Sequence, residues 1–159
     1  MKRFLLITVL SLIGISSFAQ SGKSIYNKYS EAKGVSAVYI SPAMFRLMGK
    51  LPDMSFSDED IDLSKVVKSL DGFYLLDSEN ESINRELAAD VRKFIQGNDY
   101  ELMMEVKDDG EVVKMFTIGK GDDITGFVML ADEKDECTFI CMDGHMSREM
   151  LESIISKID

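Results

Sequence analysis

The chain is poor in the residues from which most catalytic and metal centres are built. Its 159 residues include two cysteines, one histidine, two prolines and no tryptophan. One imidazole is available as a general base, and the sequence has no Gly-x-Ser-x-Gly, Cys-x-x-Cys or His-Glu-x-x-His motif. We therefore expect no enzyme and no bound cofactor. A hydrolase that uses two of the 28 acidic residues as a carboxylate pair is an alternative.

Positive charge is scarce as well. The 18 lysines and arginines are outnumbered by 28 aspartates and glutamates, which gives a formal net charge of −10 at pH 7. The basic residues are scattered singly, with acidic residues close by. Because an acidic surface repels phosphate backbones and anionic lipid headgroups, we expect neither nucleic acid nor a membrane surface as a partner.

The first residues have the pattern of a secretory signal peptide. Lys2 and Arg3 precede an apolar stretch at residues 4–15, and Ser17 and Ala19 are the small residues that a signal peptidase requires. At about 1.5 Å per residue, a helix of this length is too short to cross about 30 Å of hydrocarbon. We therefore expect a cleaved signal peptide and no membrane span after its removal.

Cleavage is expected between Ala19 and Gln20, so that residues 1–19 are removed and residues 20–159 form a single domain. No cysteine follows the apolar stretch, so we expect no lipoprotein. The expected location is the periplasm or the extracellular medium.

The remaining chain predicts a set of helices and strands. Apolar residues at helical spacing and capped termini predict helices at residues 24–34, 42–49, 62–70, 78–97 and 147–158. Apolar runs and period-two alternation predict strands at residues 35–41, 71–78, 100–108, 111–118, 124–131 and 137–142. These segments predict an α+β fold with a mostly antiparallel sheet. We expect a four-strand C-terminal meander, with amphipathic helices packed on one face of the sheet.

Three local motifs predict where elements begin and turn. Ser78, followed by Glu81, predicts a capping box at the start of the helix 78–97. Ser41 is the expected N-cap of the helix 42–49. The Asp-Asp-Gly sequence that ends at Gly110 predicts a hairpin turn, with the glycine in a left-handed conformation.

Both cysteines and the histidine lie in the segment CTFICMDGH, at residues 137–145. On a strand, Cys137, Phe139 and Cys141 share a face, and the two cysteines lie about 13 Å apart at about 3.3 Å per residue. A disulfide tolerates a Cα separation of no more than about 7 Å. We expect both cysteines as unpaired core groups around Phe139, with an intermolecular disulfide or a reactive thiol as alternatives.

Copper(I) is another possible role for this segment. Cys141, Met142, His145, Met146 and Met150 supply the soft ligands that copper(I) favours. However, Cys141 and Met142 point to opposite faces of a strand, and Met150 belongs to the apolar stripe of the last expected helix. We therefore predict core packing, with His145 as an exposed loop residue.

A calcium loop is suggested by Asp58, Asp60 and Asp62. The EF-hand loop needs glycine at its sixth position and glutamate at its twelfth, where this chain has Leu63 and Ser69. We therefore expect an acid-rich helix N-terminus instead of a calcium site.

One apolar segment predicts an interaction surface. The apolar residues at positions 44–56 exceed what a short helix and loop can bury, and exposed methionines make adaptable contacts. Packing against the core is the alternative. The candidate residues are Met44, Phe45, Met48, Leu51, Met54 and Phe56.

Four segments of the chain together resemble a known family. They are KYSEAKGVSAVYISPAMFRLM, LDGFYLLDSE, YELMMEVKDDGEVVKMF and FVMLADEKDECTFICMDG. In these core and turn patterns, residues 24–159 are similar to the domain of unknown function 4252. The resemblance implies an exported protein of Bacteroides-type bacteria and implies no activity or catalytic residue. Some relatives are lipoproteins, but this chain has no cysteine at the cleavage site.

These observations predict an exported, non-enzymatic protein-interaction module. Its expected partner is another envelope protein. A small-molecule or metal-binding envelope sensor is the alternative, which predicts a ligand that survives purification.

Overall fold

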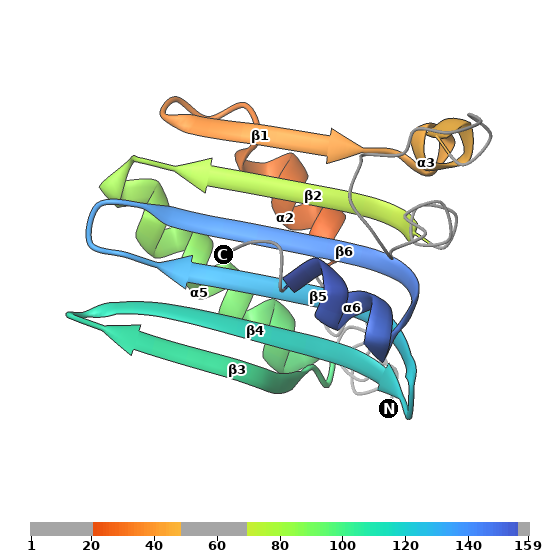
Figure 1. Cartoon of the computed structure of the whole chain (residues 1–159). Helices are drawn as coiled ribbons and strands as arrows, with labels where there is room; N and C mark the ends of the chain where they lie inside the picture. The colour runs from red at the N-terminus through yellow and green to blue at the C-terminus, as the bar shows by residue number, and fades with distance from the viewer. Residues whose placement is uncertain (1–20, 49–69, 156–159) are drawn as a thin grey trace, which may run out of the picture.

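One antiparallel sheet of six strands organises the described part of the chain (Figure 1). The computed structural model describes residues 21–48 and 70–155, so the expected signal peptide lies outside the described residues. So does the expected helix at residues 62–70, except for Leu70. The strands are β1 (Val35–Ile40), β2 (Leu70–Ser78), β3 (Glu101–Asp108), β4 (Glu111–Lys120), β5 (Asp123–Asp132) and β6 (Cys137–Ser147). The helices are α2 (Gly22–Tyr29), α3 (Pro42–Met48), α5 (Glu81–Gly97) and α6 (Arg148–Ile155).

The strand order across the sheet is β1-β2-β6-β5-β4-β3, and every neighbouring pair is antiparallel. The last four strands are therefore neighbours in chain order, as the expected meander requires. β2 adds to the other side of β6, and β1 adds beyond β2. The predicted α+β fold with a mostly antiparallel sheet is confirmed.

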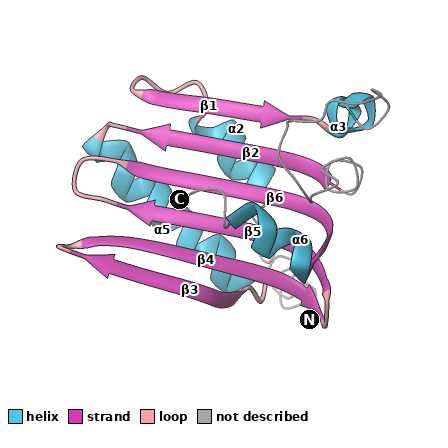
Figure 2. Ribbon diagram, in the orientation of Figure 1, coloured by secondary structure: helices cyan, strands magenta, loops and turns pink. Residues whose placement is uncertain are grey.

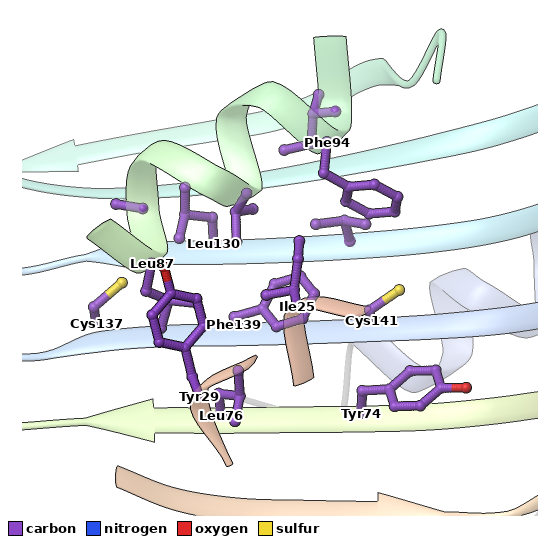
Figure 3. Close-up of a cluster of buried hydrophobic side chains, with 14 residues drawn as sticks. Ile25, Tyr29, Tyr74, Leu76, Leu87, Phe94, Leu130, Cys137, Phe139 and Cys141 are labelled. Carbon is purple, nitrogen blue, oxygen red and sulfur yellow. The ribbon is translucent and has the colours of Figure 1, made fainter. Parts of the chain in front are cut away.

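Two helices cover one face of the sheet, which we call the α5 face. Figures 1 and 2 show α2 and α5 behind the strands. The buried cluster on this face includes Ile25 of α2, Leu87 and Val91 of α5, and Phe139 of β6 (Figure 3). None of the described helices is long and apolar enough to cross a bilayer.

The C-terminal helix lies on the opposite face, which we call the α6 face (Figure 2). Leu151 of α6 belongs to a second buried cluster with Phe127, Met142 and Met146. Neighbouring residues of a strand point to opposite faces, so β6 contributes Cys141 to one cluster and Met142 to the other. The expected cover on a single face therefore holds for α2 and α5, whereas α6 covers part of the other face.

The helix α5 begins two residues later than the expected capping box. Its N-cap is Asn80, whose Oδ1 accepts hydrogen bonds from the backbone N–H groups of Ser82 and Ile83. Ser78 is instead the last residue of β2, where it is fully buried opposite Cys137. The prediction of Ser78 as N-cap is wrong because the pairing of β2 with β6 extends through this residue.

The strand β6 continues past its expected end at residue 142. Gly144 adopts a φ of +136°, which a glycine permits without strain, and pairing with β5 resumes at Met146 and Ser147. His145 therefore lies in a strand and not in a loop. Its side chain is exposed as expected, and its Nδ1 lies 3.1 Å from a carboxylate oxygen of Asp123.

Other local predictions are confirmed. Asp109 and Gly110 have φ values of +44° and +93°, so β3 and β4 are joined by a two-residue turn of the type that favours glycine. The hydroxyl of Ser41 accepts the backbone N–H of Met44 at 3.3 Å, as an N-cap of α3 does.

An ion pair links the two helices of the α5 face. Asp90 of α5 accepts hydrogen bonds from Lys28 Nζ at 2.6 Å and from the Tyr29 hydroxyl at 2.8 Å. Burial raises the pKa of the Asp90 carboxyl, but these two hydrogen bonds outweigh burial and hold the pKa below its usual value. The ionised carboxylate therefore stabilises the fold above about pH 4, and this contribution is lost as the pH falls through the folded-state pKa.

We expect Asp90→Asn to lower the free energy of unfolding at pH 7 by about 1–3 kcal/mol, because it removes hydrogen bonds to a charged group. Urea denaturation measures this value. The control Glu86→Gln changes an exposed carboxylate on the same helix and should cost less than about 0.5 kcal/mol. The difference between wild type and Asp90→Asn should shrink below about pH 4. A difference that is equal at pH 7 and pH 3 would contradict the assignment.

Candidate interaction surface

Among the described residues, β1 and β3 form the two edges of the sheet. In the described part of the chain, β1 pairs only with β2 and β3 pairs only with β4. Figure 1 places these strands at opposite sides of the sheet. The outer backbone N–H and C=O groups of an edge strand are available to hydrogen-bond with a further strand. Both edges are therefore candidate binding sites.

The strand β1 lacks the features that usually protect a sheet edge. Its sequence VSAVYI contains no charged residue, proline or glycine. Its register with β2 is regular from Val35, opposite Ser78, to Ile40, opposite Phe73. Proteins commonly blunt an edge with lysine, proline or a β-bulge. β1 therefore presents a regular and uncharged backbone to an added strand.

The hydrogen-bond pattern identifies which backbone groups of β1 point outward. The C=O of Gly34 accepts the N–H of Glu79 at 3.0 Å, so this pair is hydrogen-bonded. Hydrogen-bonded and non-hydrogen-bonded pairs alternate along an antiparallel ladder. Ala37 and Tyr39 therefore direct their N–H and C=O groups away from β2.

Apolar side chains flank this backbone on both faces. Tyr39 is 41% exposed, and its ring stacks on Tyr74 with centroids 5.3 Å apart and an interplanar angle of 11°. Tyr26 of α2 packs against both rings. On the α6 face, Val38 is 45% exposed and lies opposite Leu75. A tyrosine held by two neighbouring rings is a preorganised contact for a partner.

The helix α3 exposes one residue of the predicted interaction patch and buries another. Met44 is 47% exposed, whereas Phe45 is 5% exposed and packs in the buried cluster of the α6 face. Leu47, which the sequence analysis did not select, is 55% exposed and lies one helical turn from Met44. Positions 44 and 47 lie on the same face of a helix, whereas position 45 lies on another. This spacing could have identified Leu47 from the sequence. Met48 is the last residue of α3, and Leu51, Met54 and Phe56 lie outside the described residues.

A row of apolar side chains crosses the α6 face from edge to edge. Residues directly opposite each other on neighbouring strands share a face. Both ends of the row are exposed, Met115 is buried, and the other three members are half-buried. An apolar surface that reaches both edges offers additional contact to a strand that adds there. This apolar row comprises Val38, Leu75, Ile140, Met129, Met115 and Met104, one from each strand in spatial order.

The strand β3 is chemically different from β1. Every residue of β3 is exposed, and a register shift lies between Leu102 and Met104. It also has charged side chains, since Glu105 lies 3.2 Å from Lys107 and 2.9 Å from Lys114. The irregular first half and the charged second half make β3 a more selective edge than β1.

The two cysteines are core residues, as predicted. Cys137 and Cys141 are unpaired and fully buried on either side of Phe139 (Figure 3). Burial, followed by the charge of Asp132, raises the pKa of the Cys137 thiol to about 12. Burial also raises the pKa of the Cys141 thiol well above its usual value. A protonated, inaccessible thiol is a poor nucleophile and metal ligand.

The residues considered for copper(I) lie apart. Cys141 is buried on the α5 face beside α2, Met142 and Met146 are buried on the α6 face, and His145 is exposed. The side chain of Met150 lies outside the described residues. Within the described ranges, no group of three or more His, Cys, Asp or Glu residues is placed to hold a metal ion. The candidate calcium residues Asp58, Asp60 and Asp62 also lie outside those ranges.

A small polar cluster that the sequence analysis missed lies around Asp143. This residue is paired with Gly72 on one side and with Gly126 on the other. A Cβ atom at either glycine would lie 2.7 Å from a phenolic oxygen, that of Tyr74 at Gly72 and that of Tyr100 at Gly126. The two hydroxyls therefore occupy the space on either side of the Asp143 carboxyl. Glycines inside two apolar strand segments were the available signal.

Burial changes the proton affinities of this cluster. It raises the pKa of the Asp143 carboxyl, and it raises the pKa of Tyr74 to about 12, with the Asp143 charge as a second cause. Burial, followed by the interactions with Cys141 and Asp143, also raises the pKa of Tyr100. The Cys141 Sγ lies 3.8 Å from a carboxyl oxygen of Asp143. Chemically, the cluster brings together two hydroxyls, which donate and accept hydrogen bonds, and one carboxyl.

The contact between Gly22 and Cys141 positions α2 on the sheet. A Cβ atom at Gly22 would collide with the Cys141 Sγ, whereas a Cβ atom at Gly97 meets nothing within 4 Å. We expect Gly22→Ala to lower the free energy of unfolding by about 1–3 kcal/mol through overpacking. Gly97→Ala should be neutral or stabilising by up to about 1 kcal/mol.

Urea denaturation measures both glycine variants. The double variant Gly22→Ala/Cys141→Ala should lose less stability than the sum of its single changes, because it removes the colliding sulfur. Equal stability of Gly22→Ala and Gly97→Ala would show that α2 does not rest on β6 at this point.

Comparisons with known proteins give one match. A family model described as a domain of unknown function (DUF4252) matches residues 29–154. The matched range begins in α2 and ends in α6, so it includes all six strands. Comparisons with curated proteins and with solved structures found no match. The family resemblance predicted from the sequence is therefore confirmed.

Proposed function

Because the chain belongs to the DUF4252 family, a domain of unknown function, we propose a function from its geometry. We propose that the protein is an exported, non-enzymatic binding module that accepts an extended apolar segment of another envelope protein along β1. The observation that supports this most directly is the regular, uncharged edge of β1. The signal-peptide pattern of residues 1–19 supports export.

The chemistry of the edge defines the kind of partner. An added strand would form backbone hydrogen bonds with Ala37 and Tyr39, which supply affinity independent of the partner's sequence. Its side chains would alternate between the two faces, next to Tyr39 on the α5 face and next to Val38 on the α6 face. Both neighbouring sites are apolar and neither is charged. The partner segment is therefore expected to be extended, apolar and without buried charge.

The exposed residues of α3 extend this surface. α3 follows β1 after Ser41, and Met44 and Leu47 are its exposed apolar residues. Figure 1 shows α3 at the C-terminal end of β1. A partner strand longer than β1 would therefore meet an adaptable methionine and a leucine beyond its last backbone pair. This accounts for one residue of the predicted patch, Met44.

Site-specific photo-crosslinking tests the proposal. A photoreactive amino acid at Ser36, an exposed residue of β1, should form an adduct with an extended apolar segment of an envelope protein in intact cells. Val38→Lys, which places a charge at the edge, should reduce the yield at least tenfold. The same photoreactive residue at Glu86, exposed on α5, is the control. No adduct at Ser36, or an adduct that Val38→Lys leaves unchanged, would contradict the proposal.

A second candidate function is small-molecule binding at the polar cluster of Asp143, Tyr74 and Tyr100. The observation that favours it is the pair of hydroxyls on either side of a half-buried carboxyl. A ligand of this site would need both a hydrogen-bond donor for Asp143 and an acceptor for the phenols.

One native mass spectrum of the protein recovered from cells without reductant tests both export and this second candidate. Cleavage between Ala19 and Gln20 predicts the mass of residues 20–159. A bound small molecule should be present in the wild type and absent from Tyr100→Phe, which removes only one hydroxyl. An intact residue 1–19 segment would contradict export. A wild type without added mass would count against the second candidate.

A further inference from the structure

The edge strand β3 exposes several large apolar side chains. Its four large apolar residues are between 37% and 53% exposed, although the strand pairs with β4 on its inner side. A long, exposed and apolar edge strand is a template for pairing with another chain. These residues are Leu102, Met103, Met104 and Val106.

Only the second half of β3 is regular enough to pair. The register shift between Leu102 and Met104 interrupts the ladder in the first half. From Met104 to Asp108 the register with β4 is continuous. The pairing segment is therefore MEVKD, at residues 104–108.

The turn between β3 and β4 determines which backbone groups of this segment point outward. Because the loop has two residues, Asp108 and Glu111 close it as a hydrogen-bonded pair. Alternation then directs the N–H and C=O groups of Val106 toward β4 and those of Glu105 and Lys107 toward the open edge. A further strand would bond to Glu105 and Lys107.

We propose that two copies of this chain form a symmetric dimer in which β3 pairs antiparallel with β3 of the second copy, with Val106 on the two-fold axis. In this register, Glu105 of each copy lies opposite Lys107 of the other. Each such pair exchanges two backbone hydrogen bonds, and its side chains have opposite charge. Val106 meets its own copy as a close, non-hydrogen-bonded pair.

Charge complementarity selects this register over its neighbours. A two-fold pairing centred on Glu105 places two carboxylates directly opposite each other, and one centred on Lys107 places two ammonium groups together. A pairing centred on Met104 extends into the interrupted part of the strand. The register centred on Val106 is the one of these four that places Glu105 opposite Lys107 of the other copy and keeps the pairing within residues 104–108, where Asp108 lies opposite Met104. Within one chain, Glu105 already contacts Lys107 and Lys114. In this register, Lys107 of the other copy also lies next to Glu105.

The proposed pairing joins two six-stranded sheets into one. A two-fold axis perpendicular to the sheet keeps the same face of both copies on the same side. On this shared α6 face the two Val106 side chains meet at the axis, and Met104, where the apolar row ends, lies opposite Asp108 of the other copy. This surface is independent of the proposed partner site, which lies at the opposite edge on β1.

Cysteine crosslinking tests the geometry. Both native thiols are buried, so a cysteine introduced on the surface reacts alone. Val106→Cys should form a disulfide-linked dimer at least tenfold faster than Val38→Cys, because the close Cα pair at the axis suits a disulfide. Val38 has a similar exposed fraction on the other edge strand and is the matched control. Equal rates for the two variants would overturn the register.

Charge reversal tests the contacts that select the register. Sedimentation equilibrium at about 0.15 M salt should give a dimer for the wild type, and Glu105→Lys or Lys107→Glu should each raise its Kd at least tenfold. The double variant Glu105→Lys/Lys107→Glu should restore the Kd to within about threefold of wild type. A monomeric wild type, a double variant as weak as the singles, or a dimer abolished by Val38→Lys would each overturn the proposal. The photo-crosslink at Ser36 of β1 should persist in Glu105→Lys. Failure of the dimer proposal can therefore be distinguished from failure of the proposed function.

Discussion

The pairing of β6 with both β2 and β5 is the interaction on which the rest of the molecule depends. It places β6 inside the sheet, so residues of β6 are buried on both faces. Cys137, Phe139 and Cys141 pack in the buried cluster of the α5 face, and Met142 and Met146 pack with α6. Because a shift of one residue would exchange these two sets, the two apolar clusters fix the register. The position of every other strand follows from it.

The same pairing order determines where the protein can bind. Placing β2 between β1 and β6 leaves β1 at one edge, and the meander leaves β3 at the other. The two edges have different chemistry, since β1 is regular and uncharged while β3 is interrupted and charged. An uncharged edge accepts many extended partners, whereas a charged edge accepts only a register that matches its charges. The apolar row connects the two edges across the α6 face.

The sequence predicts the helices, strands and turns better than it predicts which of these elements lie side by side in the fold. Alternation in β6 correctly placed both cysteines beside Phe139, and the Asp-Asp-Gly turn was correctly located, because both depend on local geometry. The N-cap of α5 was misplaced to Ser78 because strand pairing through Ser78 is a long-range interaction. The face occupied by α6 and the identity of the edge strands depend on the same pairing. Two glycines around Asp143 come from different strands, so their meeting is also not visible in a local pattern.

Amide hydrogen exchange of the whole protein, measured residue by residue at two concentrations, tests the distinction between the edges most directly. If β3 pairs with a second copy and β1 is left for a partner, the amides of Glu105 and Lys107 exchange slowly in the concentrated sample and rapidly after dilution. The outward amides of Ala37 and Tyr39 exchange rapidly in both samples. Concentration-independent exchange at Glu105 and Lys107, or protection of Ala37 and Tyr39 by self-association, would contradict the assignment of the two edges.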